Sequence, residues 1–129
     1  MSGLDVIPCY REAVDLVMRV ACSVEYIDKA VSFGPGLRYA LMGPNLIYRL
    51  GGGPHGIQSI LKHVGNSVEL WWEDMATWKK WPPGWYEKAQ EGVNEEMANR
   101  ILEQGRTNEE ITRWRDEGLI EILKFLKKI

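Results

Sequence analysis

Residue types that can carry out chemistry are present in this sequence, but their spacing does not group them into a catalytic or metal site. Glu95 and Glu96 form one of several adjacent acidic pairs. Adjacent residues point in different directions on a helix, so the two carboxylates are not placed to share a proton in acid–base catalysis. His55 and His63 have no cysteine or carboxylate at the spacing of a zinc site. We therefore expect no catalytic residue and no metal ligand in this chain.

Motifs of nucleotide-binding and catalytic loops are also missing from the sequence. There is no Gly-x-Gly-x-x-Gly after a strand, no Gly-x-x-x-x-Gly-Lys-Ser/Thr, no His-Glu-x-x-His and no Gly-x-Ser-x-Gly. The triple glycine 51–53 has no predicted strand before it, so we interpret it as a helix-breaking turn and not as a phosphate-binding loop. We expect no cofactor-binding residue in this chain.

The two cysteines, Cys9 and Cys22, are far apart, and each falls in an apolar helical pattern. The sequence contains no Cys-x-x-Cys pair. Cysteines of this kind are typical of reduced core residues in cytosolic proteins. We predict that both are buried and that the protein is cytoplasmic.

Size and composition favour one globular domain spanning residues 1–129. The 16 basic and 18 acidic residues are interspersed and give a formal net charge of −2, so the chain lacks the basic stripe that collects nucleic acid phosphates. Apolar runs are broken within about a dozen residues, short of the roughly 20 that span a bilayer, and the amino end lacks a signal-peptide pattern. We expect neither a nucleic acid nor a membrane as a partner.

Apolar residues recur at three- and four-residue intervals along most of the chain, which predicts amphipathic helices. The first helix is expected over 5–21, with Asp5 as its N-cap and Pro8 in its first turn, where the missing N–H is tolerated. The second is expected to begin after its N-cap, Ser23, and to end at Gly34.

The segment 34–44, GPGLRYALMGP, contains two Gly-Pro pairs around one arginine. The residue before a proline is pushed out of the α region, and glycine opens left-handed conformations. We predict a sharply turned loop here. Two short helices should follow, one ended by 51–53 and one from Pro54 to Gly65.

The stretch 66–78 carries two conflicting signals. Val68, Leu70 and Trp72 alternate as in a strand, whereas Asn66 is placed to cap a helix. We predict a helix, because no other part of the chain offers a strand partner.

The last third of the chain has the clearest local signals. A helix is expected from the Trp-Pro-Pro-Gly-Trp turn at 81–85 to Gln104. Thr107 and Glu110 form a capping box, which predicts a final helix running to Ile129. The predicted fold is all-α, a compact bundle of about six or seven helices.

Tryptophan is frequent, with six residues in the chain and four of them close together. These side chains can fill a core, or they can form an interface, where aromatic residues are enriched. The sequence leaves both interpretations open. The clustered residues are Trp71, Trp72, Trp78 and Trp81.

The motifs of 12–44 resemble the start of the C-terminal helical domain in the 3-hydroxyacyl-CoA dehydrogenase superfamily. They are a Glu-Ala helix, a Ser-x-x-x-Ile-Asp-x-Ala helix and a Gly-Leu-Arg-Tyr-Ala-Leu-Met-Gly-Pro segment. The last motif, with Arg38, resembles the branch that contains L-gulonate 3-dehydrogenase (lambda-crystallin) and L-carnitine dehydrogenase. The stretches 86–97 and 114–128 are similar to the lambda-crystallin tail, whereas the resemblance is loose at 65–85.

This resemblance implies a helical domain like the C-terminal domain of 6-phosphogluconate dehydrogenase. It also implies an NAD-dependent oxidation of a 3-hydroxy acid or its thioester, with NAD and the catalytic His–Glu pair on an N-terminal Rossmann domain that this chain does not contain. The active-site Asn of the family would fall near Gly3, and Asn45 stands where the family commonly has Phe or Leu. On this basis the isolated chain should be inactive.

Two roles follow from the resemblance. Segment 34–44 would face the interdomain cleft, where the guanidinium of Arg38 could bind a substrate carboxylate through two parallel hydrogen bonds. A structural role, in which Arg38 ties down the loop, is the alternative. The helical domain would also form a homodimer and would need a Rossmann partner in cis or in trans. A different class of function is a free-standing helical interaction protein that keeps the fold without dehydrogenase activity.

Overall fold

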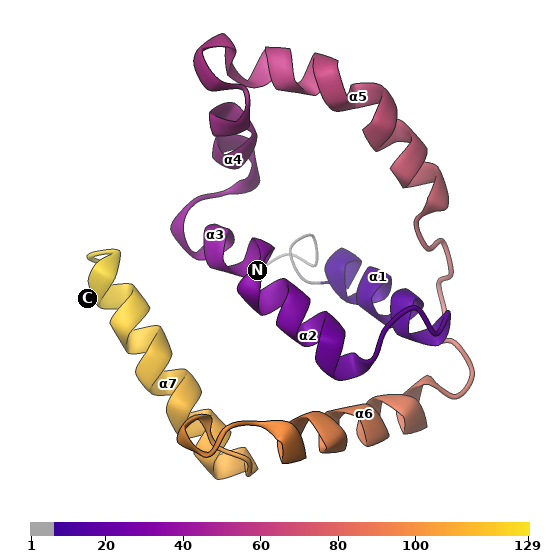
Figure 1. Cartoon of the computed structure of the whole chain (residues 1–129), viewed down its shortest axis with the longest axis vertical. Coiled ribbons are helices and arrows are strands. Elements are labelled where there is room, and N and C mark those ends of the chain that lie inside the picture. Colours follow the sequence, from indigo (N-terminus) through magenta and orange to yellow (C-terminus); the bar gives the residue numbers. More distant parts are fainter. Residues whose placement is uncertain (1–6) are drawn as a thin grey trace.

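The computed structural model describes residues 7–129 and contains seven α-helices and two short 3-10 turns, with no strand within that range (Figure 1). The all-α prediction is therefore confirmed for this part of the chain. No described helix is long and apolar enough to cross a bilayer. The elements are α1 (Ile7–Met18), α2 (Val24–Phe33), α3 (Pro35–Leu41), α4 (Pro44–Gly51), η1 (Gly53–His55), α5 (Gly56–Asp74), α6 (Trp85–Asn99), η2 (Leu102–Gln104) and α7 (Asn108–Phe125).

Two of the predicted helix starts have the expected cap. The hydroxyl of Ser23 accepts a hydrogen bond from the amide of Tyr26 at 3.0 Å and caps α2. At α7, the hydroxyl of Thr107 accepts from the Glu110 amide, and the Glu110 carboxylate accepts from the Thr107 amide, both at 3.2 Å. The predicted cap at Asp5 lies outside the described residues, as does the family's Asn position near Gly3.

The prediction of a loop over 34–44 is wrong, because most of this segment is α3. A proline without an N–H fits the first turn of a helix, whose amides have no intrahelical acceptor. Pro35 and Pro44 both occupy this position, so each Gly-Pro pair ends one helix and begins the next. The chain bends at Gly34, where φ is −110° and ψ is −113°, and not across the whole segment.

Other boundaries also differ from the prediction. The helix predicted for 66–78 is present, but it is continuous with the preceding one, because α5 runs through Gly65 without a break. The helix expected to reach Gln104 ends at Asn99 instead. Arg100 takes an extended backbone conformation there, and its side chain bonds the carbonyls of the following turn.

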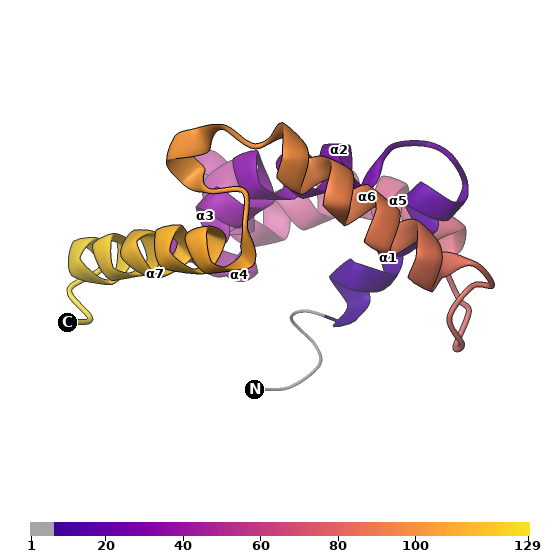
Figure 2. The ribbon, with the colours of Figure 1, turned by 90° about the horizontal axis from the view of Figure 1, so that it is seen from below.

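The buried core is small and lies where α1, α2 and α6 meet. The side chains of Val14 and Val17 on α1 contact Val24 of α2 and Trp85 of α6. Gly92 lets α2 and α6 approach closely, because a Cβ at this position would lie 2.5 Å from a methyl carbon of Val24. Figures 1 and 2 show α1 and α2 next to α6, which runs along the lower edge of the molecule in Figure 1.

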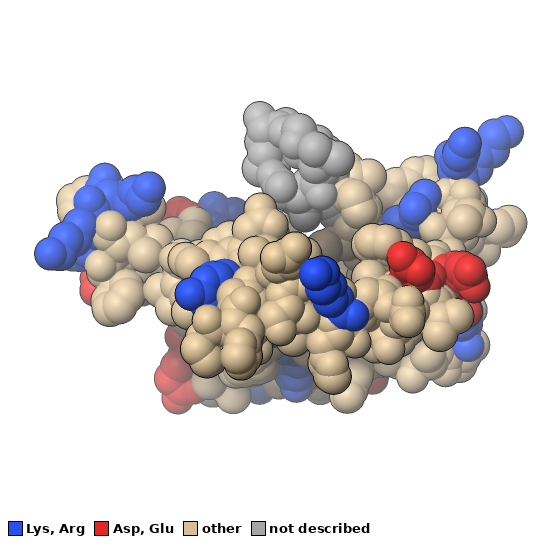
Figure 3. Space-filling view, turned by 90° about the horizontal axis from the view of Figure 1, so that it is seen from above, with Lys and Arg blue, Asp and Glu red and all other residues tan. Residues whose placement is uncertain are grey.

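Outside this core the fold is open. The helix α4 packs chiefly on α5, and the pair forms an arm that arches away from the core and returns to α1 at the carboxyl end of α5 (Figure 1). The helix α7 leaves the end of α6 as a second arm, and its main neighbour in the chain is η2. Neither α4, α5 nor α7 contains a buried residue. Most of the surface seen in Figure 3 belongs to residues other than Lys, Arg, Asp and Glu.

The accessible surface gives a measure of this openness. The chain of 14.8 kDa exposes 10421 Å², whereas a compact monomer of that mass exposes about 7000 Å². The excess of roughly 3400 Å² is too large to be explained by scattered surface side chains. One copy of the chain therefore leaves more surface exposed than a compact monomer of its mass.

Because the core is small, several residues that the sequence pattern assigns to the interior are exposed. Cys9, predicted to be buried, is exposed on α1, and Cys22 is half-buried at the edge of the core. The tryptophans divide between the two interpretations. Trp78 packs against the core, whereas Trp71 and Trp72 on α5 are each 64% exposed.

Candidate functional site

Arg38 is the one residue for which the sequence predicts a binding role. It lies in the last turn of α3, where a cation is favourable at the negative end of the helix dipole. Its side chain is exposed and forms no hydrogen bond or ion pair with another residue of 7–129. The structural alternative, in which Arg38 ties down its own segment, has no such contact to support it. The guanidinium has its donors free for a ligand.

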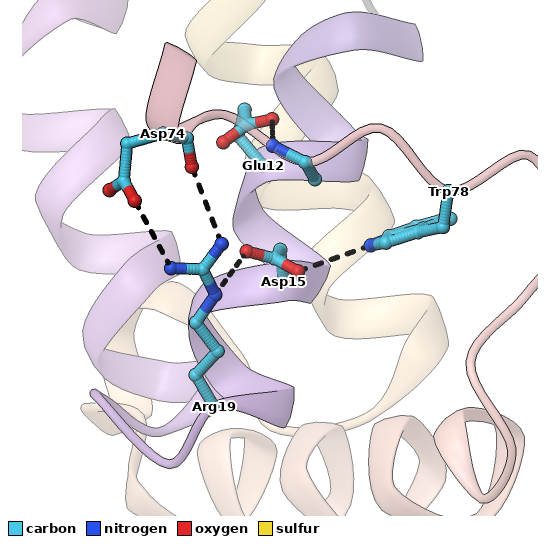
Figure 4. Close-up of polar contacts among 6 residues, drawn as sticks. Glu12, Asp15, Arg19, Asp74 and Trp78 are labelled. Carbon is cyan, nitrogen blue, oxygen red and sulfur yellow. Dashed lines mark hydrogen bonds and ion pairs between the residues drawn. The ribbon is translucent and has the colours of Figure 1, made fainter. Parts of the chain in front are cut away.

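A polar group that joins distant parts of the chain is the α1 clamp, which we define as Glu12, Asp15 and Arg19. Glu12 accepts a hydrogen bond from the Ala76 amide at 2.8 Å, and Asp15 accepts one from the indole N–H of Trp78 at 3.1 Å (Figure 4). These contacts join residues more than sixty positions apart in the sequence, so helical periodicity gave no sign of them.

Arg19 completes the α1 clamp. Its guanidinium lies 2.7 Å from the Asp15 carboxylate and donates to the backbone carbonyl of Asp74 at 3.3 Å, as Figure 4 shows. Both clamp carboxylates accept from donors of the 76–78 segment or from Arg19, so the clamp holds the end of α5 against α1. We interpret these residues as structural and not as an acid–base pair.

A second acidic group forms where α2 and α6 pack together. Burial, followed by the neighbouring carboxyls of Asp28 and Glu25, raises the pKa of Glu96 to about 7. One carboxyl oxygen of Glu96 is buried without a hydrogen-bond partner in the described residues. The hydrogen bond from Asn99 and the proximity of Lys29 lower the pKa of Glu25. The contact between α2 and α6 partly buries Glu96, whereas Glu95 beside it is exposed.

The third polar group fixes the start of α7. Arg100 donates to the carbonyls of Gln104 and Gly105, each at 2.9 Å. Its guanidinium also lies 4.9 Å from the ring centre of Trp114, within the range of a cation–π contact. Gly105 has φ +85°, a conformation that favours glycine. These contacts determine the direction in which α7 leaves α6.

Aromatic side chains gather at the amino end of α1. Tyr10 lies edge-to-face with Trp81 at 5.9 Å and with Trp85 at 6.3 Å between ring centres. Trp81 also contacts Trp78 and Tyr86. This cluster joins the turn before α6 to α1, so part of the tryptophan group serves the core.

Comparison with known proteins agrees with this helical arrangement. Residues 6–94 match the family model described as 3-hydroxyacyl-CoA dehydrogenase, C-terminal domain. The L-carnitine dehydrogenase of Bacillus cereus is 34% identical over 92% of this chain, and that of Nocardiopsis dassonvillei is 32% identical over 93%. The L-carnitine dehydrogenase of Streptomyces coelicolor is 32% identical over 89%.

These alignments cover 34% of each of the three relatives. The chain thus spans about a third of the length of the curated relatives it matches. The family match extends over more than half of the chain and includes α1 to α5, the α1 clamp and Arg38. The resemblance inferred from the sequence is confirmed, and the chain belongs to the 3-hydroxyacyl-CoA dehydrogenase family as its C-terminal domain.

Proposed function

We propose that this chain is the dimerisation and substrate-cleft domain of an NAD-dependent dehydrogenase that oxidises a 3-hydroxy acid or its thioester. The observation that carries the proposal is the family match over residues 6–94, together with relatives named L-carnitine dehydrogenase that are about three times as long. The NAD-binding Rossmann domain and the catalytic residues would be supplied by the rest of such an enzyme, in cis or in trans. The chain alone is then inactive.

Arg38 is the proposed substrate-binding residue. L-carnitine, the substrate in the names of the relatives, is a 3-hydroxy acid with a free carboxylate. A guanidinium with unoccupied donors can bind such a carboxylate through two parallel hydrogen bonds. A thioester has no carboxylate at the corresponding position, so this contact favours free hydroxy acids.

Homodimer formation is the second part of the proposal. An obligate dimer interface buries about 2,000–5,000 Å² counted over both partners, so one partner's share fits within the excess of roughly 3400 Å² that each chain exposes over a compact monomer. A two-fold dimer covers the same surface on both copies. The exposed aliphatic and tryptophan side chains of α5 and α7 provide the apolar area that such an interface requires.

The dimer is tested first by light scattering of the purified chain, with NAD added to the same sample and followed by tryptophan fluorescence. We expect the mass of a dimer and no saturable response to NAD. A monomer would contradict the dimerisation role. Saturable NAD binding would contradict the proposal that NAD binds to a Rossmann domain outside this chain.

The Arg38 role is tested by joining the chain to the N-terminal part of the Bacillus cereus relative. We expect NAD reduction with L-carnitine, and in the Arg38→Lys variant a KM at least tenfold higher, because a lysine lacks the planar pair of donors. Arg113→Lys, at an exposed position of α7, is the matched control. An unchanged KM for Arg38→Lys would remove the carboxylate role.

A further inference from the structure

Two helices carry apolar stripes that the chain itself leaves open. On one face of α5, apolar residues recur about once per turn on both sides of Gly65. On one face of α7, apolar residues recur in the same way on both sides of Gly118. We define the α5 stripe as Leu61, Gly65, Val68 and Trp72, and the α7 stripe as Trp114, Gly118, Ile122 and Phe125. Val68 is half-buried, and the larger side chains are strongly exposed, from 41% at Ile122 to 74% at Phe125.

The central glycines have no explanation within one copy of the chain. Glycine in the middle of a helix is unfavourable compared with alanine, so a close neighbour usually accounts for it. Gly92 has such a neighbour in Val24, whereas a Cβ on Gly65 or Gly118 would meet no atom within 4 Å. If α5 and α7 crossed each other at Gly65 and Gly118, the absence of a side chain on both glycines would let the two helix backbones approach closely.

The two stripes match each other in length and spacing. The helices have 19 and 18 residues, which corresponds to about 27 Å each. Counted from the central glycine, the α5 stripe has its other members at −4, +3 and +7, and the α7 stripe has them at −4, +4 and +7. Side by side and parallel, the two helices bring large residues next to one another at both ends of the contact.

The charges at the helix ends favour a parallel arrangement of α5 and α7 over an antiparallel one. The carboxyl end of α5 carries Glu69, Glu73 and Asp74, whereas the corresponding end of α7 is followed by Lys127 and Lys128. A parallel pairing places these opposite charges together. An antiparallel pairing would instead place the acidic end of α5 against the first turn of α7, which is also acidic.

The α7 stripe cannot reach the α5 stripe of its own chain in this structure. The bonds of Arg100 and the geometry at Gly105 fix the direction of α7, which contacts mainly η2. The excess exposed surface, roughly 3400 Å² per chain, is ample for one partner's share of a large dimer interface. A second copy can cover both stripes at once, because a two-fold axis repeats each contact.

We infer that in the dimer α7 of one copy lies parallel on α5 of the other, and that the two helices cross at Gly65 and Gly118. This inference rests on the proposed homodimer and adds its geometry. Each copy thus gives one helix and receives one, so the α4–α5 arm of each copy gains a packing partner that its own chain does not supply.

Substitution of the two glycines separates a free helix surface from a helix crossing, because the two arrangements predict different effects on self-association. On a free helix surface, Gly65→Ala and Gly118→Ala increase helix stability and leave self-association unchanged. At a helix crossing, the added methyl groups separate the helices, and we expect each variant to weaken self-association at least tenfold in sedimentation equilibrium. The matched controls Ser67→Ala and Glu117→Ala, on faces away from the stripes, should change it less than twofold.

Loss of folding would not imitate this result, because alanine is the stronger helix former and circular dichroism must show retained helicity. The pairing itself is tested with chains that carry Cys9→Ser and Cys22→Ser. One such chain has Val68→Cys and a tag, and the other has Ile122→Cys. After mixing and oxidation we expect a disulfide between tagged and untagged chains.

The possible failures are distinguishable. A monomeric chain contradicts the proposed dimer and this inference together. A dimer whose association is unaffected by both alanine variants, or in which Val68→Cys links only to its own kind, overturns this inference and leaves the proposed dimer intact.

Discussion

In the α1–α2–α6 core, side chains are held by contacts between helices, whereas α7 is held only at its amino end. Val14 and Val17 are inaccessible to solvent, but no residue of α7 is buried. Both regions have well-formed helix starts, capped by Ser23 and by Thr107. Local signals therefore define a helix equally well whether or not the helix packs within its own chain. What differs is the partner, which in our proposal is a second copy.

The largest expected effect comes from removing the central side chain of the core. Trp85 is 6% exposed and contacts the valines of α1 and α2. Trp85→Ala should lower the free energy of unfolding by about 3–5 kcal/mol, because it leaves a cavity that these short helices can close only in part. Urea unfolding followed by circular dichroism measures this loss.

The neighbouring residue provides the control for Trp85. Tyr86 lies on the same turn of α6 but is 67% exposed. Tyr86→Ala should cost less than about 1 kcal/mol, as is usual for surface positions. Equal losses in the two variants would contradict the assignment of the core to this face of α6.

A smaller effect is expected where α2 and α6 touch. In Gly92→Ala the added Cβ would lie 2.5 Å from a Val24 methyl carbon, so one helix must shift. We expect a loss of about 1–3 kcal/mol from overpacking. The double variant Gly92→Ala/Val24→Ala should recover part of this loss. Gly118→Ala provides the comparison, because a Cβ at Gly118 would meet no atom of the same chain within 4 Å.

The helical fold was largely predictable from sequence, because apolar spacing and caps are local signals. The capping box at Thr107 is an example, and it was found as predicted. The segment 34–44 was mispredicted because a Gly-Pro pair can end a helix and also begin the next one. Contacts between distant residues were not predictable, since neither the α1 clamp nor the position of Glu96 beside Asp28 leaves a periodic signal. Arg38 was found through resemblance, and its role stays a prediction.

The smallest expected effect concerns Glu96, at the edge of the same α2–α6 contact. In the folded chain its pKa is raised to about 7 from an ordinary value of 4.5, first by burial and then by Asp28 and Glu25. Between these two values the folded state binds more protons than the unfolded state. Stability from this group is therefore fully present below pH 4.5 and is lost as pH rises through 7.

Glu96→Gln removes this titration while keeping the size of the side chain. Relative to the unchanged protein, the variant should gain about 1 kcal/mol on going from pH 5 to pH 8, a value reduced for solvent screening because Glu96 is only partly buried. Thermal unfolding at both pH values measures the difference, and Glu95→Gln, at the exposed adjacent position, should give none. If Glu96→Gln changes the stability by the same amount at pH 5 and at pH 8, Glu96 stays ionised in the folded state at both pH values. The α2–α6 contact would then be more open to water at its edge than the buried carboxyl oxygen of Glu96 indicates.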